Sequence, residues 1–425
     1  MDSGLTSYRS ALDNLFARTG STAKFGLDRT HAFLALLGNP HHRLRAFHVA
    51  GTNGKGSVVA TLDCLLRAKG MSVGRYTSPH LVDFRERIVI DDQQISEPEV
   101  LEFIQRWQPA FERLGATFFE ITTALAFEHF ASRNVDVALI ETGLGGRLDS
   151  TNVLTPVVAG VTSIGVDHVE YLGSSVAGIA AEKAGIFKQG VPAVFGPVSD
   201  IARESMLEVA LRAGATPIIE STETYRPDNV RVEWRGTTFD VAHGDESATL
   251  TTGLVGEYQS VNTCTALAML DAASGPYRTS LTDAARSLPG VSLAGRFQRV
   301  GKFIVDVAHN PDGMRALVST LHSVNPPRPI VAVLGILRDK DWREMMRTLC
   351  PQVETTILTT PASAPTDRVW NANEALAFGK ENNWPMKVIG DLGHAIDHAA
   401  SEAATVIVTG SFHTVGDATA SGALR

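Results

Sequence analysis

The feature that most constrains the fold is a glycine-rich segment, Gly51-Thr52-Asn53-Gly54-Lys55-Gly56-Ser57, placed between an apolar run and a helical stretch. The apolar run Ala46–Ala50 predicts a buried strand, and the stretch that continues to Gly70 predicts a helix. A strand, a glycine loop and a helix in this order can hold a phosphate group on backbone amides and a helix N-terminus. Lys55 supplies a cation, and the Ser57 hydroxyl can reach Mg²⁺.

The spacing of this segment departs from the common nucleotide-binding loop, because one glycine separates the lysine from the serine. The alternative interpretation is a glycine-rich turn without a ligand, and the glycines alone do not decide between the two. The lysine and the serine in register favour the phosphate loop. Nucleotide contacts are therefore predicted for Thr52, Asn53, Gly54, Lys55, Gly56 and Ser57.

Short apolar runs alternate with amphipathic stretches from about residue 46 onward, which is typical of parallel strands joined by helices. A chain of 425 residues is expected to form two domains. One helix has a clear start signal at Ser96-Glu97-Pro98-Glu99. The other predicted buried strands are Val135–Glu141, Pro156–Ser163, Pro192–Phe195, Phe303–Ala308, Pro329–Leu334, Thr355–Leu358, Lys387–Ile389 and Thr405–Thr409.

Between about residues 228 and 252 the pattern changes to short alternating segments that predict antiparallel hairpins: Val230–Trp234, Thr238–Val241 and Ala248–Thr251. The βα alternation restarts after Leu288-Pro289-Gly290, so we expect domains at 1–295 and 296–425. The predicted class is α/β. We expect a doubly wound, mostly parallel sheet of the phosphate-loop type with a small antiparallel sheet, followed by a Rossmann-like C-terminal domain.

The amino-acid composition limits the classes of partner that the chain is expected to bind. The net charge of −8 argues against a nucleic-acid or anionic-membrane partner, because such proteins need a basic face. The three cysteines lie far apart, without the spacing of a disulfide framework or a zinc site. The start lacks a signal-peptide pattern, and no apolar run reaches the ~18 residues of a membrane span. We expect a cytoplasmic protein.

Polar residues also follow other predicted strands, where a parallel sheet gathers its ligand-binding groups. Glu141 ends the strand beside the phosphate loop and is the predicted protein ligand of a nucleotide-bound Mg²⁺. Asp167-His168 follows the next strand, and His168 could ligate a second Mg²⁺ or be an ordinary hydrogen-bonded histidine. Lys183 taken alone is a solvated helix charge. A further polar segment is Tyr76-Thr77-Ser78-Pro79-His80.

Over nearly its whole length the chain resembles the folylpolyglutamate synthase and dihydrofolate synthase family of the Mur ligase superfamily. Besides the phosphate loop, the segments that carry the resemblance are Thr77–His80, Glu141–Asn152, Asp167-His168, Leu172-Gly173, Glu182–Ile186, Asp306–Pro311 and Gly410–Thr414. The resemblance implies ATP as cosubstrate with Mg²⁺, two ions being expected, held by Ser57, Ser78, Glu141 and His168. It implies that Lys183 is carbamylated to N6-carboxylysine. It also implies ATP contacts from Asn262, Arg296 and Asp306, completed when the domains close.

The resemblance further implies a site for dihydropteroate or reduced folate. The residues that match are Phe25, Gly26, Leu27, Asp28, Arg29, Phe118, Phe119, Glu120, Leu148 and Asp149. An alternative remains open for some of them, because Phe118 and Phe119 are also ordinary core residues and Asp28 could cap the following helix.

The activity implied is ATP-dependent ligation of L-glutamate. The substrate carboxylate is activated as an acyl phosphate, and Lys55 with Mg²⁺ neutralises charge during phosphoryl transfer. His309 and Asp306 at a strand end are candidates to position glutamate or take its ammonium proton, and Ser411 is a further candidate to bind glutamate.

Three questions stay open at this stage. A cell-wall amino-acid ligase of the same superfamily would need a domain ahead of the loop, for which the 50 residues before Gly51 are too few. A regulatory nucleotide switch would want an Asn-Lys-x-Asp segment, and Arg338-Asp339-Lys340-Asp341 lacks the asparagine. Within the family, the pterin-like segments and the Gly410–Thr414 ending favour a bifunctional enzyme that adds the first glutamate and extends the tail. The usual state of the family is a monomer.

Overall fold

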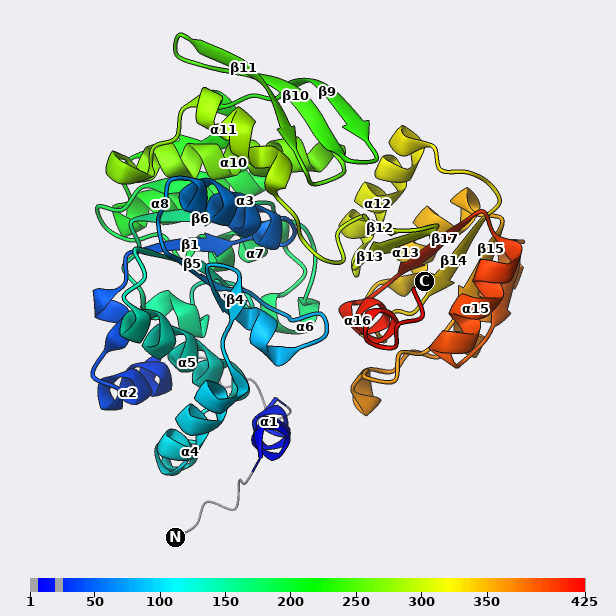
Figure 1. Cartoon of the computed structure of the whole chain (residues 1–425), viewed down its shortest axis with the longest axis horizontal. Coiled ribbons are helices and arrows are strands. Elements are labelled where there is room, and N and C mark those ends of the chain that lie inside the picture. Colours follow the sequence, from blue (N-terminus) through cyan, green and yellow to red (C-terminus); the bar gives the residue numbers. More distant parts are fainter. Residues whose placement is uncertain (1–6, 20–25, 425) are drawn as a thin grey trace. The chain divides into compact units, whose positions relative to one another are not determined.

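The structure is a computed structural model that describes residues 7–19 and 26–424, and the chain divides into two compact units (Figure 1). The first unit comprises Met1–Pro79, Arg85–Arg226 and Asn262–Ser287. The second comprises His80–Phe84, Pro227–Val261 and Leu288–Arg425. The expected domains at 1–295 and 296–425 assign a function to each part of the chain, and this division stays a prediction.

The first unit is built on an eight-stranded sheet with the strand order β4-β3-β2-β5-β1-β6-β7-β8. Its strands are β1 (Ala46–Ala50), β2 (Val73–Tyr76), β3 (Ile88–Ile90), β4 (Gln93–Gln94), β5 (Val137–Glu141), β6 (Val158–Val161), β7 (Ala193–Phe195) and β8 (Ile218–Glu220). All neighbours from β2 to β8 pair in parallel, and β3 and β4 are antiparallel at one edge. The chain passes from β1 to β2 on one side and from β5 to β6 on the other, so the winding reverses around β1. The carboxyl ends of strands at such a reversal are where α/β sheets bind ligands.

Helices cover both faces of this sheet. On one face, Phe130 of α5 lies against Gly74, and small residues of α7 and α8 pack on β1 and β6. On the opposite face, Met269 of α10 lies against Gly160, while α3 contacts β1, β2 and β5. The helices of this unit include α1 (Tyr8–Phe16), α2 (Asp28–Leu36), α3 (Lys55–Ala68), α4 (Glu97–Leu114), α5 (Phe118–Arg133), α6 (Val169–Leu172), α7 (Val176–Ala184), α8 (Asp200–Ala213), α9 (Ser221–Thr224) and α11 (Leu281–Ser287), and α10 (Glu257–Ala273) begins in the second unit.

The second unit contains a six-stranded sheet with the order β12-β13-β17-β14-β15-β16, parallel except at β12. The strands are β12 (Gln298–Val300), β13 (Phe303–Asp306), β14 (Ile330–Leu334), β15 (Thr355–Leu358), β16 (Met386–Val388) and β17 (Thr405–Thr409). Its helices are α12 (Pro311–Val324), α13 (Trp342–Leu349), α14 (Ala372–Glu381), α15 (Leu392–Glu402) and α16 (Phe412–Ala420).

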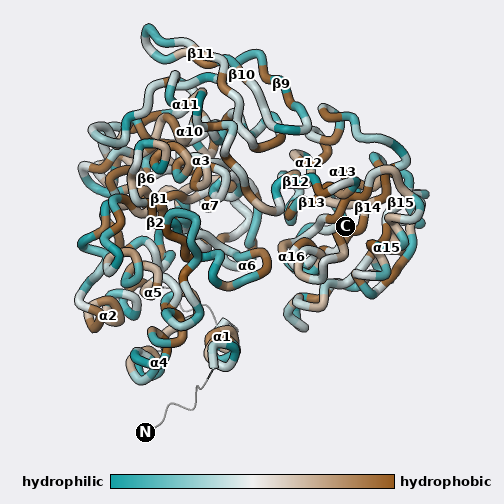
Figure 2. The backbone as a smooth tube through the Cα atoms, viewed as in Figure 1, coloured by the Kyte–Doolittle hydropathy of each residue, from teal (hydrophilic) through white to brown (hydrophobic). Residues whose placement is uncertain are grey.

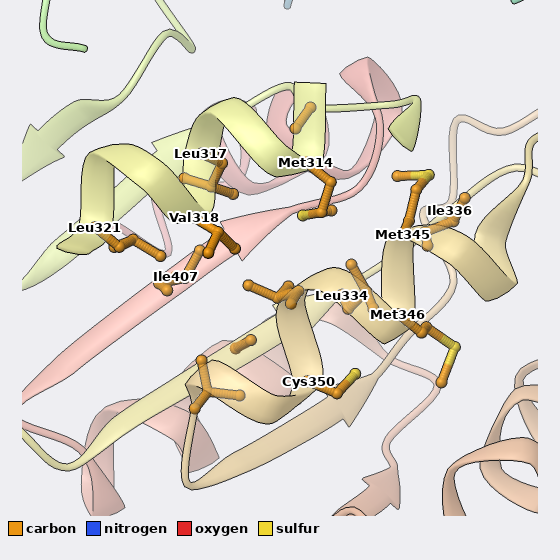
Figure 3. Packing of buried hydrophobic residues seen from close by; sticks show 14 of the residues in the cluster. Met314, Leu317, Val318, Leu321, Leu334, Ile336, Met345, Met346, Cys350 and Ile407 are labelled. Carbon is orange, nitrogen blue, oxygen red and sulfur yellow. The ribbon is translucent and has the colours of Figure 1, made fainter. Parts of the chain in front are cut away.

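Alternate side chains of these strands enter two separate cores. One core joins Leu334 and Ile407 to α12, α13 and α14, and Figure 3 shows Leu317, Val318 and Leu321 of α12 facing these strands. The other core joins the opposite strand faces to α15 and α16. The four central strands β13, β14, β15 and β17 are therefore buried on both sides, which explains their nearly continuous apolar sequences.

A three-stranded antiparallel sheet, ordered β11-β10-β9, belongs to the second unit. It consists of β9 (Asp228–Glu233), β10 (Gly236–His243) and β11 (Glu246–Thr252). Figure 2 shows the turn between β10 and β11 as hydrophilic, in contrast to the hydrophobic central strands such as β14.

The predicted fold class is confirmed, as are the antiparallel hairpins and the helix start at Ser96, where the capping box forms with Glu99. Strands predicted to begin at Pro156, Pro192 or Pro329 begin one or two residues later, because proline lacks the amide hydrogen that a ladder needs. The polar edge strands β4 and β12 were not predicted, since neither contains an apolar run. In the described residues, no helix is long and apolar enough to cross a bilayer.

Candidate active site

The glycine segment forms a tight loop between β1 and α3. Gly54 precedes the helix with φ +87, a left-handed conformation that favours glycine. A β-carbon at Gly54 would also lie 2.5 Å from Oδ1 of Asn262, the predicted ATP contact on α10. The structure thus brings Asn262 to the loop. Helix α3 begins at Lys55, so its first amides border the loop as the sequence predicts.

Side chains from the end of β6 hold the loop in place. Thr162 Oγ1 donates to the Asn53 carbonyl at 2.6 Å, and Ser163 Oγ accepts from the Asn53 amide at 3.1 Å. Thr52 Oγ1 accepts from the Gly165 amide at 3.0 Å. Sequence reasoning missed Thr162 and Ser163 as loop supports. Their position at a strand end was the available signal, but the neighbour of that strand end is known only from the sheet order.

Two lysine ammonium groups converge on one backbone carbonyl. Lys55 Nζ donates to the Gly51 carbonyl at 3.0 Å and to the Thr52 carbonyl at 3.3 Å. Lys183 Nζ, carried by α7, donates to the same Gly51 carbonyl at 2.9 Å. Lys183 is therefore a buried lysine at the phosphate loop, and not the solvated helix charge that it would be taken for alone.

The environment of Lys183 changes its ionisation. Burial, followed by the nearby Lys55 ammonium, lowers the pKa of Lys183 to about 7, and Asp167 and Asp149 only partly oppose this. A large fraction of the side chain is thus a neutral amine near neutral pH. A neutral amine is the form that can react with an electrophile such as CO₂.

Glu141 lies at the carboxyl end of β5, directly beside β1. Its side chain is buried; Oε1 lies 3.8 Å from Lys55 Nζ, and Oε2 accepts from the Ser78 amide at 3.4 Å. Ser57 is also buried, in the first turn of α3. Ser57 and Glu141 thus lie beside the loop and Ser78 lies next to Glu141. The oxygen donors that these residues carry are of the type that fits a hard cation such as Mg²⁺.

His168, the fourth predicted metal ligand, has a left-handed backbone conformation and precedes α6. Its Nε2 lies 3.9 Å from Asp167 Oδ2, and its amide donates to Asp167 Oδ1 at 2.8 Å. Among the residues that the structure describes, no three His, Cys, Asp or Glu side chains gather as a metal cluster. The four candidate metal ligands therefore differ in chemistry: two are hydroxyls, one is a carboxylate and one is an imidazole.

The predicted pterin residues come from three elements. Arg29 of α2 forms a two-point ion pair with Glu120 of α5, Nε–Oε2 3.2 Å and Nη2–Oε1 3.1 Å. The ring of Phe119 lies against Gly143, where a β-carbon would be 2.4 Å from it. Phe118 is buried under the guanidinium of Arg87, 5.2 Å from the ring centroid. The sequence did not predict this contact between Arg87 and Phe118.

Other predicted pterin residues lie at the ends of the same elements. Gly26 and Leu27 precede α2, and Asp28 begins that helix. Leu148 is half-buried beside Asp149, whose carboxylate accepts hydrogen bonds from within its own loop. Phe25 lies outside the described residues.

The candidate residues of the second unit lie at the ends of β13 and β17, which are neighbouring strands. Asp306 is buried and accepts from the amides of Phe297 and Ala308, each at 2.8 Å, and burial raises its pKa. Arg296 stacks over the ring of Phe412 at 5.5 Å.

His309 and Ser411 follow the same two strands. His309 Nδ1 lies 2.9 Å from the Val307 carbonyl and, as the donor, leaves Nε2 as the lone-pair nitrogen of the neutral ring. Ser411 caps α16, because its hydroxyl accepts from the Thr414 amide at 3.0 Å. Phe412 links the groups, since its ring also lies 5.4 Å from that of His309.

Comparison with known proteins identifies the family. The model of the Mur ligase middle domain matches residues 49–270, and that of the Mur ligase glutamate ligase domain matches residues 295–412. The dihydrofolate synthase/folylpolyglutamate synthase of Escherichia coli is 33% identical over 430 residues, covering 97% of this chain and 94% of that protein. The chain belongs to the folylpolyglutamate and dihydrofolate synthase family of Mur ligases.

Solved structures of this family agree. Folylpolyglutamate synthase of Mycobacterium tuberculosis complexed with ADP superposes with a TM-score of 0.89 at 32% identity, covering 98% of this chain and 99% of that one. A bifunctional folylpolyglutamate synthase/dihydrofolate synthase with Mn, AMPPNP and L-glutamate bound gives a TM-score of 0.85 at 33% identity, with 98% of each chain covered. The predicted resemblance and the predicted class of ATP-dependent ligase are confirmed, which disfavours the nucleotide switch.

Proposed function

We propose that this protein joins L-glutamate to dihydropteroate and to the glutamate tail of reduced folates, using ATP to activate the accepting carboxylate as an acyl phosphate. The observation that supports it most directly is the convergence of the phosphate loop, Lys55 and Glu141 at the carboxyl ends of β1 and β5. The bifunctional relative of E. coli and the solved neighbours that bind ADP or AMPPNP support the same reaction.

The phosphate loop binds ATP in this proposal, through the amides of residues 52–57 and the ammonium of Lys55. Asn262 contacts the loop directly and is assigned to the same nucleotide. Arg296 and Asp306 are assigned as further ATP contacts supplied by the C-terminal domain. Their support is the anchoring of the Phe297 amide on Asp306, which fixes the backbone next to Arg296.

Ser57, Ser78, Glu141 and His168 are proposed to hold Mg²⁺, two ions being expected. When bound, the metal supplies positive charge that stabilises the transferring phosphoryl oxygens. Lys183 is proposed to carry a carbamate, formed when its neutral amine adds to CO₂ and loses a proton. This change replaces an ammonium beside Lys55 with an anion, and so removes the repulsion that, after burial, lowers the pKa of Lys183.

The acceptor is proposed to bind along Gly26–Arg29, Phe118–Glu120 and Leu148-Asp149. Its carboxylate attacks the γ-phosphorus of ATP, the bond to the ADP oxygen breaks, and an acyl phosphate forms. The glutamate amine then attacks the carbonyl carbon and phosphate leaves. His309 is proposed to accept the ammonium proton at Nε2, and Ser411 to bind glutamate; exclusion of water protects the acyl phosphate. We also propose a cytoplasmic monomer without nucleic-acid or membrane partners.

The test is phosphate release measured with ATP, glutamate and either dihydropteroate or tetrahydrofolate. Release should require all three substrates and occur with both acceptors. Lys55→Ala and Glu141→Ala should each lower kcat by at least ~10²-fold, because each removes charge stabilisation of the transition state. Lys69→Ala, at the exposed opposite end of α3, is the control and should retain activity. Near-normal turnover in either site variant, or release without glutamate, would contradict the assignment.

A further inference from the structure

A histidine without an assigned role occupies the central strand of the first unit. His48 is fully buried in the middle of β1, between Ile140 of β5 and Ala159 of β6. Burying an imidazole costs free energy unless its polar atoms find partners. Nε2 has one, because it lies 2.8 Å from Thr151 Oγ1, whereas Nδ1 is buried with no hydrogen-bond partner in the described structure. An apolar residue would fill this position at lower cost.

The direction of each hydrogen bond can be deduced. Asp149 Oδ1 accepts from the Thr151 amide at 3.0 Å and from Thr151 Oγ1 at 2.5 Å. Its Oδ2 accepts from the Gly143 amide at 2.8 Å and the Leu144 amide at 2.9 Å. Burial raises the pKa of Asp149, but the three backbone amides can only donate, and their hydrogen bonds stabilise the ionised carboxylate, which has no proton to give to Thr151. The single hydroxyl proton of Thr151 therefore points to Asp149, and the hydroxyl oxygen must accept from His48.

This orientation fixes the tautomer of the histidine. Burial lowers the pKa of His48 to about 3, so the ring is neutral and carries one N–H group. That hydrogen is on Nε2, and the unpartnered Nδ1 is the lone-pair nitrogen. The chain of donors runs in one direction, from His48 through Thr151 to Asp149.

This series of hydrogen bonds connects two parts of the candidate active site. His48 of β1 precedes Gly51 by three residues, and the Gly51 carbonyl, just after the strand, contacts both Lys55 and Lys183. Asp149 accepts hydrogen bonds from the amides of Gly143 and Leu144, which lie two and three residues after Glu141. These hydrogen bonds thereby connect β1, which leads into the phosphate loop, to the segment that follows Glu141, the candidate metal ligand.

We propose that His48 and Thr151 are positioning residues for the ligase reaction: donation from His48 Nε2 to Thr151 orients the Thr151 hydroxyl toward Asp149, which sets the backbone after Glu141. This inference rests on the proposed function. Outer partners of metal ligands typically change metal affinity or activity by roughly 10–100-fold when they are removed. Removing the Thr151 hydroxyl is therefore expected to lower the ligase activity by more than the accompanying loss of stability explains.

Matched variants test the proposal in the full-length protein. Thr151→Val removes the hydroxyl and should lower kcat/KM for the pterin substrate by at least ~10-fold, with a higher Mg²⁺ concentration needed for half-maximal rate. Thr151→Ser keeps the hydroxyl and should stay within ~3-fold of wild type. His48→Gln keeps a donor near Nε2 and should retain more activity than His48→Leu.

The control is Thr405→Val, which removes another buried hydroxyl, bonded at 2.8 Å to the Pro327 carbonyl at the start of β17. It should lower the melting temperature about as much as Thr151→Val while leaving kcat/KM unchanged. Equal kcat/KM in Thr151→Val and Thr151→Ser would overturn the proposal, as would an equal loss in Thr405→Val.

A spectroscopic measurement does not depend on turnover. Nitrogen-15 NMR of histidine-labelled protein, with His48 assigned by its absence in His48→Gln, should show a protonated Nε2 and an unprotonated Nδ1 at neutral pH. The opposite tautomer would refute the relay. If wild type fails to consume ATP with pterin and glutamate but shows the expected tautomer, the proposed function fails while the hydrogen-bond chain stands.

Discussion

At the scale of single residues, Lys183 shows how a fold changes the chemistry of a side chain. Its ammonium would lie beside that of Lys55 in a buried place, and this combination lowers its pKa to about 7. Above that pH the amine is mainly neutral and can add to CO₂. Below it the ammonium prevails, and an ammonium has no lone pair to attack with.

We therefore expect carbamylation of Lys183 to decline as the pH falls through about 7. Activity in CO₂-depleted buffer should be low and should recover on adding bicarbonate, more completely at pH 8 than at pH 6. Lys183→Arg keeps a cation that cannot be carbamylated, and should lose at least ~10²-fold in kcat without recovery. Mass spectrometry under native conditions is the direct measurement, and a fully active protein with an unmodified Lys183 would contradict the expectation.

Residue types in the motifs were sufficient to predict a glycine loop between a strand and a helix, because this arrangement depends on local order along the chain. The roles given to Lys55 and Glu141 stay predictions. The residues that hold the loop in place could not be predicted in this way. Thr162, which follows β6, and His48 on β1 carry no signal of this role until the sheet order places β6 and β5 on either side of β1. The assignment of Glu120 as a pterin residue stays a prediction, and the structure adds its ion pair with Arg29.

At the scale of elements, the close approach of the Glu141–Asp149 loop to α7 determines where Lys183 lies. The Arg147 amide donates to the Glu182 carbonyl at 2.8 Å, so the loop and the helix are joined through their backbones. A β-carbon at Gly146 would lie 2.6 Å from the Lys183 carbonyl and 2.7 Å from that of Glu182. These neighbours are backbone atoms, which cannot rotate away as a side chain can.

Gly146→Ala should consequently displace α7 and lower both the melting temperature and kcat, the latter by ~10-fold or more. Gly178→Ala on the same helix is the control, because its β-carbon would meet nothing closer than 3.7 Å. Since alanine is the better helix former, that variant should be neutral or slightly stabilising. Thermal melting by circular dichroism and the ligase assay measure the two effects, and equal behaviour of both variants would contradict this account.

The element pattern was predictable where strands are central and apolar. Thr355–Leu358 and Thr405–Thr409 have the bounds that the sequence predicts, because both are buried on both faces. The short edge strands β4 and β12 could not be predicted, because they pair with neighbouring strands without being hydrophobic themselves.

At the scale of the whole molecule, each compact unit draws on separate parts of the chain. The core that α12, α13 and α14 form with the six-stranded sheet is also covered by Val232 and Trp234, from the strand β9 and the turn that follows it. The Trp234 ring lies under the Arg299 guanidinium at 4.7 Å and 6.4 Å from the ring of Phe297. A fragment that starts at residue 296 contains the sheet but lacks this cover.

The isolated fragment 296–425 should therefore melt at a lower temperature than a fragment in which 227–261 is joined to 288–425 by a flexible linker. The cause is the apolar surface that Val232 and Trp234 leave exposed when they are absent. In the full chain, Trp234→Ala should destabilise the second unit by ~1–3 kcal/mol, whereas Trp234→Phe, which keeps an aromatic ring for Arg299 to stack on, should cost less. Circular dichroism melting compares the fragments, and urea unfolding compares the variants. Equal melting temperatures would show that the sheet and its own helices form a complete core, and that the separate segment adds nothing to its stability.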